Sequence, residues 1–241
     1  MDLHRVFLVL ADISGYTRFI KSHKTSLLHA EHIITQLMES VIDSSENPLQ
    51  LNKLEGDAVL LYAESDGTPK AAQDILGQVR RFFEAFYGRQ SQLEEFNICH
   101  CAGCMQIGQL DLKAILHCGE VAIKQVRQFE ELAGTDVILA HRLLKNSIGK
   151  KEYILMTEPF FTLSGGLPGE VVEQRTENCE GIGRVSVRVQ YPQHQIVPAA
   201  IAALPGVIWW RKMAQFVPMQ AYTFLRMAGM LKGPQMDLPA A

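Results

Sequence analysis

Residues 5–12, RVFLVLAD, decide the fold, and the segment ISGYT follows them directly. A continuous apolar run of this length is typical of a strand that is buried on both faces. The carboxylate of Asp12 stands at the end of that strand. Residues 14–40 come next and repeat apolar side chains at helical spacing, so we expect mostly helix there.

A hairpin and a long helix are expected next. Residues 49–54 and 58–62 predict two short strands, and the glycine of Glu55-Gly56-Asp57 permits a tight turn between them. Residues 70–87 form a strongly amphipathic pattern with aromatic side chains on one side, which predicts a helix.

The second half of the chain repeats this alternation of strands and helices. We expect a hairpin that turns at Gly119, because the runs 110–116 and 121–126 flank it. A helix over 137–144 and strands over 153–156 and 185–189 complete the pattern. The order of elements favours an α+β sandwich, in which helices cover one face of a mostly antiparallel sheet.

Composition narrows the classes of function. The chain has 241 residues, 47% apolar and 20% charged, with a net charge of −3, so there is no basic field for nucleic acid. Five cysteines form an odd set and the first residues do not resemble a signal peptide, which favours the cytoplasm.

We place a domain boundary near residue 192, between a domain over 1–191 and a basic, aromatic-rich helical tail over 192–241.

Two acidic residues suggest a metal site. Asp12 ends a buried strand, and Asp57 lies in the turn of the predicted hairpin. If the two strands are neighbours, both carboxylates reach the same edge of the sheet and offer the hard oxygen ligands that Mg²⁺ or Mn²⁺ prefers. Taken singly, Asp12 also fits a helix cap and Asp57 a turn former.

Four segments together resemble the signature segments of class III adenylate and guanylate cyclases. They have the same order and spacing as in that family, and the resemblance covers roughly residues 5–157. The segments are ADISGYTRF (11–19), KLEGDAVLLY (53–62), LKAILHCGEV (112–121) and GTDVILAHRL (134–143). The resemblance implies the ferredoxin-like sandwich of these cyclases.

The resemblance also implies a set of site residues. Asp12 and Asp57 match the two aspartates that hold two Mg²⁺ or Mn²⁺ ions, with the backbone carbonyl of Ile13 as a further ligand. Lys53 and Glu131 match the positions that read the purine, and this pair is similar to an adenine-type pair. A surface contact of Lys53 with Asp57 or Glu55 is the alternative, and such a contact contributes little to stability.

The expected catalytic pair is incomplete. In the family, an Asn and an Arg four residues apart on one helix face stabilise the transition state; here these positions hold Ile138 and Arg142. An isoleucine side chain cannot donate a hydrogen bond, and the loss of one such donor lowers turnover by about 10²–10³-fold. The resemblance therefore implies metal-dependent binding of ATP or a related nucleotide in signalling, with weak or absent adenylate cyclase (phosphorus–oxygen lyase) activity.

The resemblance implies a dimer as well, because class III sites form between two protomers. The partner is then a second copy of this chain or another cyclase-like chain. A non-catalytic module for dimerisation, or for docking to a membrane or partner, is the alternative function. In the tail, residues 207–231 suit either a peripheral membrane contact or packing against the core or partner.

A cysteine cluster stands apart from the family resemblance. NICHCAGCMQ (97–106) contains Cys99, Cys101 and Cys104, which can surround Zn²⁺ or act in redox chemistry. A fourth ligand would be His100, His117 or Cys118. The alternative is that these are small buried residues of a strand in a reducing compartment.

Overall fold

The computed structural model describes residues 2–22, 27–95 and 104–192. The predicted boundary near 192 is not tested, and the predicted tail contact at 207–231 lies outside the described residues. In chain order the elements are β1 (Asp2–Ser14), α1 (Tyr16–Ser22), α2 (Leu27–Asp43), β2 (Gln50–Glu55), β3 (Ala58–Glu64), α3 (Pro69–Glu95), the 3₁₀ helix η1 (Cys104–Gln109), β4 (Asp111–Val126), β5 (Phe129–Ala133), α4 (Thr135–Leu143), β6 (Tyr153–Thr157), α5 (Glu158–Ser164), β7 (Glu173–Cys179) and β8 (Gly183–Gln190).

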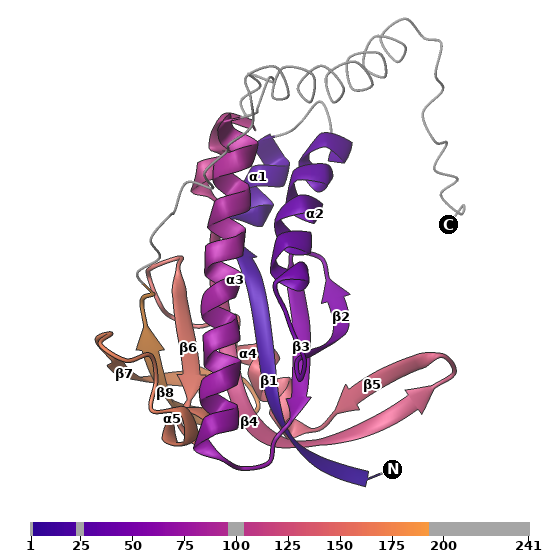
Figure 1. Cartoon of the computed structure of the whole chain (residues 1–241), viewed down its shortest axis with the longest axis vertical. Helices are drawn as coiled ribbons and strands as arrows, with labels where there is room; N and C mark the ends of the chain where they lie inside the picture. Colours follow the sequence, from indigo (N-terminus) through magenta and orange to yellow (C-terminus); the bar gives the residue numbers. More distant parts are fainter. Residues whose placement is uncertain (1, 23–26, 96–103, 193–241) are drawn as a thin grey trace, which may run out of the picture.

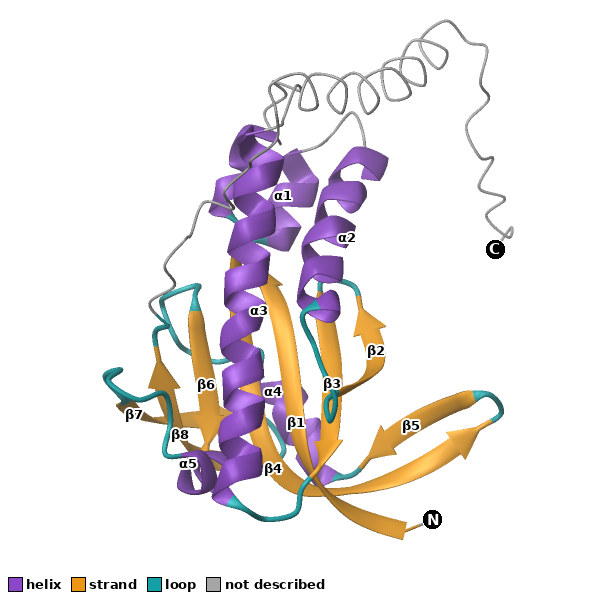
Figure 2. Cartoon of the chain, in the orientation of Figure 1, coloured by secondary structure: helices purple, strands orange, loops and turns teal. Residues whose placement is uncertain are grey.

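One sheet organises the described chain. Its strand order is β2-β3-β1-β4-β6-β8-β7, and β5 pairs with the far end of β4. Only β4 and β6 run parallel, so the predicted mostly antiparallel α+β fold is confirmed. The β4–β5 hairpin extends away from the rest of the sheet (Figures 1 and 2).

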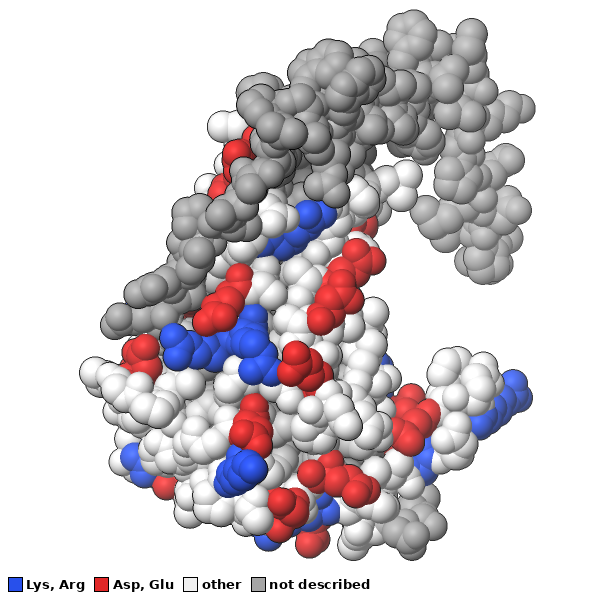
Figure 3. Space-filling model, viewed as in Figure 1, with Lys and Arg blue, Asp and Glu red and all other residues white. Residues whose placement is uncertain are grey.

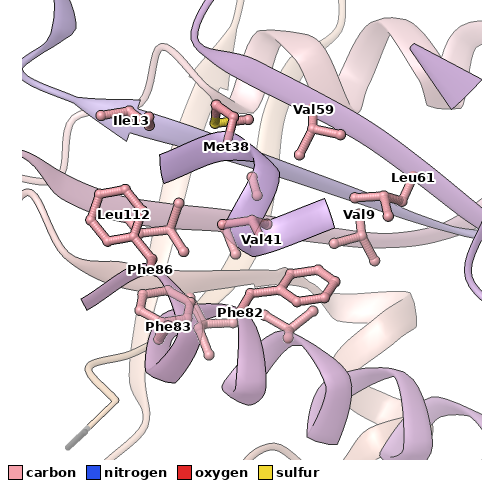
Figure 4. Packing of buried hydrophobic residues seen from close by; sticks show 14 of the residues in the cluster. Val9, Ile13, Met38, Val41, Val59, Leu61, Phe82, Phe83, Phe86 and Leu112 are labelled. Atoms are coloured by element: carbon pink, nitrogen blue, oxygen red, sulfur yellow. The ribbon is translucent and has the colours of Figure 1, made fainter. Parts of the chain in front are cut away.

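The larger core lies between the sheet and helices α2 and α3. Alternate residues of β1, Val9 and Ile13 among them, point to this side and are almost fully buried. The aromatic stripe of α3, including Phe82, Phe83 and Phe86, packs against them (Figure 4). The amphipathic spacing of these side chains explains why both helices lie flat on the sheet.

Helix α4 covers the opposite face, which corrects the expectation of helices on one face only. Its buried residues Ala140 and Leu143 join a second cluster with Leu8 and Leu10 of β1. Because β1 is apolar at consecutive positions, both of its faces need cover, and one layer of helices cannot provide it.

The predicted hairpin at Gly119 is wrong, because β4 continues through this residue as one strand to Val126. A Cβ atom at Gly119 would overlap Asp136 Oδ2 and would lie 2.5 Å from His117 Nε2. The glycine therefore makes room for a close approach within a strand, and it does not mark a turn. The chain reverses instead near Arg127, a non-glycine residue with a positive φ of 57°.

The surface carries charge of both signs. Figure 3 shows acidic and basic side chains interspersed on the face seen in Figure 1, without a large patch of one sign. Within the described residues, no helix has the length and apolar character required to cross a bilayer.

Candidate functional site

Asp12 lies near the end of β1, and Asp57 lies in the turn that leads into β3, the neighbouring strand of the sheet. β1 pairs antiparallel with β3, and Asp12 lies opposite Ala58. The N–H of Ile13 donates to the backbone carbonyl of Asp57 at 3.0 Å, so the β2–β3 turn closes directly onto the end of β1. The alternation along β1 directs Asp12 to the same face as Leu8 and Leu10, which is the face that α4 covers.

The two carboxylates share one electrostatic environment. The pKa of Asp57 is raised to about 6, first because burial disfavours the charged form and second because Asp12 is negative. Glu31 raises the same pKa further, whereas Lys113 lowers it. When both carboxylates are ionised they therefore repel each other, and positive charge beside them is favoured.

Tyr16 and Glu31 extend the site, and sequence reasoning missed both. The Tyr16 hydroxyl donates to Glu31 Oε1 at 2.8 Å. The pKa of Tyr16 is raised to about 12, chiefly by burial and then by this bond and the nearby carboxylates. Tyr16 lies in the quoted ISGYT segment, but Glu31 lies on α2, and only the docking of α2 brings it near Asp57.

Lys113 is the counter-ion of Asp12, and sequence reasoning assigned no role to it. Its Nζ lies 2.9 Å from Asp12 Oδ2, and both side chains are largely buried. The same ammonium donates to the backbone carbonyl of Leu144 at 3.1 Å, just beyond the end of α4. Lys113 thus joins the acidic site to this helix.

Lys53 and Glu131, the expected purine-reading pair, lie in contact. Lys53 Nζ is 2.9 Å from Glu131 Oε2, although β2 and β5 are far apart in sequence. The bond to Glu131 is the main reason that the pKa of Lys53 is raised. The alternative contact with Glu55 also exists, at 3.7 Å.

Ile138 and Arg142 stand one turn apart on α4. Ile138 is 54% exposed although it is apolar. Arg142 forms an ion pair with Glu180 in the β7–β8 turn. The neighbouring His141 lies with its Nδ1 3.3 Å from Glu55 Oε2, so α4 also contacts the β2–β3 hairpin.

His117 belongs to a buried polar cluster on the α4 face. Its Nδ1 lies 2.8 Å from Thr157 Oγ1, and its Nε2 lies 3.2 Å from Asp136 Oδ1. Asp136 Oδ2 also accepts the Glu120 N–H at 2.6 Å, which fixes the first turn of α4. Burial lowers the pKa of His117, and the charge of Asp136 opposes this effect.

The predicted cysteine cluster can be followed only in part. Cys99 and Cys101 lie outside the described residues, as does His100. Cys118 joins the larger core with Cys104, whereas His117 is directed to the opposite face, so His117 and Cys118 cannot converge on one ion. Cys104 Sγ instead lies 3.4 Å from His29 Nε2 on α2.

The donor set at Asp12 and Asp57 fits a hard divalent cation. Two carboxylates, one near the end of β1 and one in the turn before β3, supply oxygen ligands and negative charge, and burial together with the charge of Asp12 raises the pKa of Asp57. No group of three or more His, Cys, Asp or Glu side chains in residues 2–22, 27–95 and 104–192 is placed to hold a metal. The role of the Ile13 carbonyl as a further ligand stays a prediction.

Comparison of the sequence with known proteins identifies relatives of this chain. The family model described as "Protein of unknown function (DUF2652)" matches residues 34–153. The uncharacterized protein Rv2561/Rv2562 of Mycobacterium tuberculosis (strain H37Rv) is 34% identical over 178 residues, which are 73% of this chain and 82% of that protein.

Solved structures show the fold at lower identity. The adenylyl cyclase CyaB from P. aeruginosa aligns with a TM-score of 0.63 and 14% identity, over 81% of this chain and 98% of that one. The guanylate cyclase domain of RhGC from Catenaria anguillulae, in complex with GTP, aligns with a TM-score of 0.54 and 15% identity, over 80% and 100%. The chain belongs to the same family as the uncharacterized mycobacterial protein Rv2561/Rv2562, and its fold is that of the class III adenylyl and guanylyl cyclase catalytic domains.

Proposed function

We propose that this chain binds a nucleoside triphosphate through a divalent cation held by Asp12 and Asp57. The observation that carries the proposal is the position of the two acidic residues: Asp12 lies opposite Ala58, the residue after Asp57, and the Asp57 carbonyl accepts the Ile13 N–H at 3.0 Å. Two carboxylates in one partly buried place repel each other, and a bound Mg²⁺ or Mn²⁺ ion relieves that repulsion. When bound, the cation neutralises phosphate charge and activates the ribose hydroxyl.

In this proposal, Lys53 and Glu131 form hydrogen bonds with the base of the nucleotide. Their contact at 2.9 Å places a hydrogen-bond donor beside an acceptor, which suits the N1 and N6 positions of adenine. The pair is partly exposed, so a base can compete for both groups. ATP is therefore the proposed ligand, and the solved RhGC domain, which holds GTP, supports nucleotide binding by this fold.

Turnover is expected to be weak or absent. Ile138 presents an exposed apolar side chain on α4, where the family places a hydrogen-bond donor. Loss of one donor aimed at developing charge lowers turnover by about 10²–10³-fold. Arg142 is also engaged by Glu180 in the same chain, so its guanidinium is already paired.

A second copy of the chain is the proposed partner, in the cytoplasm. Exposed apolar side chains lie on β2, the β4–β5 hairpin and α4, the elements that carry Lys53, Glu131 and Arg142, and a partner surface would cover them. They are Leu51, Leu54, Val126, Phe129 and Ile138. If the protein dimerises but binds no nucleotide, the alternative function as a dimerisation module is favoured.

The test is a calorimetric titration with ATP and with GTP, in Mn²⁺ and again with a chelator. Saturable ATP binding that needs Mn²⁺ is expected, with more than roughly tenfold loss in Asp57→Asn because one carboxylate ligand is removed. Asp74→Asn is the matched control, since it removes the same charge from an exposed position on α3.

Each outcome separates one part of the proposal. Equal ATP affinity in wild type and Asp57→Asn would refute the metal assignment. Stronger binding of GTP would refute the adenine assignment only. Rapid formation of cyclic AMP would refute weak turnover, and sedimentation velocity that shows a monomer at high concentration would refute the dimer.

A further inference from the structure

Lys113 lies where a cation would bind Asp12. The two residues are direct partners across β1 and β4, and Lys113 Nζ lies 2.9 Å from Asp12 Oδ2. Their side chains are 17% and 14% exposed, so water screens the pair only in part. Among the ion pairs of the described residues, this is the one that contains Asp12 or Asp57.

The same ammonium also holds α4. Lys113 Nζ donates to the Leu144 carbonyl at 3.1 Å, and the last carbonyls of a helix lack partners within the helix. A positive charge at this end is favoured by the helix dipole. The Lys113 ammonium therefore forms an ion pair with Asp12 and also a hydrogen bond with the end of α4.

We propose that Lys113 is a built-in counter-ion that a divalent cation must displace from Asp12, and that this displacement couples cation binding to α4. The inference rests on the proposed function, because it takes Asp12 and Asp57 as the metal ligands. Asp12 has two carboxylate oxygens, but a divalent cation on either of them would lie only about 3–5 Å from the ammonium, and two cations this close in a largely buried place repel each other strongly. When the divalent cation binds, the ammonium leaves Asp12 and its bond to Leu144 is strained or lost.

The consequence is a link, within one chain, between the metal end of the sheet and α4. α4 carries Ile138 and Arg142, and its last turn is held to the metal end of the sheet by Lys113 and by the His141–Glu55 contact. Release of one of these two contacts gives the end of α4 more freedom. Cation binding would thereby loosen the end of α4, the helix that carries Ile138 and Arg142.

The first measurement is Mn²⁺ binding without nucleotide, by electron paramagnetic resonance of the free ion. Lys113→Met keeps the length of the side chain and removes its charge, so we expect roughly tenfold tighter Mn²⁺ binding than in wild type. Lys145→Met is the matched control, because it removes an exposed positive charge just past the same end of α4. A change of less than about twofold is expected there, since exposed charges are screened by solvent.

The second measurement is amide hydrogen exchange over residues 141–145, with and without Mn²⁺. In wild type, Mn²⁺ is expected to speed exchange in this last turn, because Lys113 leaves Leu144. In Lys113→Met the contact is already absent, so Mn²⁺ should leave the exchange rates unchanged. If Lys113→Met fails to fold, Lys113→Gln replaces it, because glutamine is neutral and still able to donate a hydrogen bond.

The outcomes distinguish this inference from the proposed function. If wild type binds Mn²⁺ and Lys113→Met binds it equally or more weakly, the role of Lys113 is overturned and the metal site stands. If neither protein binds Mn²⁺, the metal assignment fails and this inference fails with it. If Lys145→Met tightens Mn²⁺ binding as much as Lys113→Met does, the effect follows from the loss of any nearby positive charge. That result would also overturn the inference.

Discussion

Asp57→Asn should make the metal-free protein more stable at neutral pH, although it removes a proposed ligand. The pKa of Asp57 is raised to about 6 from its ordinary 3.8, mainly by burial and then by the charge of Asp12. A raised pKa means that the folded state favours the protonated form. The stability that this proton provides is present below about pH 4 and is lost as pH rises through about 6. Asparagine is neutral at every pH and avoids this loss.

The magnitude follows from the difference between the two pKa values. Each unit corresponds to about 1.4 kcal/mol, so the full difference would be about 3 kcal/mol at neutral pH. Asp57 keeps partial contact with water, which screens the charge, and we reduce the expected gain to about 1–2 kcal/mol. At about pH 4 wild type is itself largely protonated, and the two proteins should differ little.

Urea unfolding in the presence of a chelator, at about pH 7.5 and about pH 4, measures this gain. Asp74→Asn is again the control, and it should change the free energy of unfolding by less than about 0.5 kcal/mol. With Mn²⁺ at a hundred times its dissociation constant, wild type should gain about 2.7 kcal/mol and Asp57→Asn much less. A metal-free Asp57→Asn protein that is less stable than wild type at neutral pH would refute the electrostatic argument.

Two further substitutions test other parts of the site. Gly119→Ala should destabilise the protein by about 1–3 kcal/mol in urea unfolding, because its Cβ would overlap Asp136 Oδ2. The control is Gly77→Ala in α3, where a Cβ atom meets open space, and it should stabilise the protein by about 0.5–1 kcal/mol. Ile138→Asn, at an exposed position, should leave stability within about 0.5 kcal/mol and raise the rate of cyclic AMP formation by up to roughly a hundredfold. An unchanged rate would show that the missing donor does not limit turnover.

The sequence was sufficient to predict the two strands that position Asp12 and Asp57. A buried strand that ends in a carboxylate and a hairpin with an acidic turn both carry strong local patterns, and the register confirms that the strands are neighbours. Lys53 and Glu131 were found through the family resemblance alone, since β2 and β5 meet only in the folded sheet.

Lys113 and Glu31 were beyond the reach of the sequence because their roles depend on register and on helix docking. Lys113 faces Asp12 through the exact pairing of β1 with β4, and a shift by one residue would direct it to the other face. Gly119 led to the wrong prediction of a hairpin, because a glycine that relieves crowding and a glycine that permits a turn look the same in sequence. β7 was missed because its sequence, EQRTENC, is polar and suits an edge strand.

The two faces of the sheet differ in a way that bears on function. α2 and α3 bury a wide apolar surface, whereas in the described chain the opposite face is covered by the nine residues of α4, with a smaller apolar cluster. Polar contacts therefore carry much of the positioning of α4: Asp136 fixes its first turn, and His141 and Lys113 hold its last. A helix held in this way changes position at lower cost than one packed into a large core. Both ends of α4 are thus held by charged groups, and the proposed divalent cation would change the charge at the end that Lys113 holds.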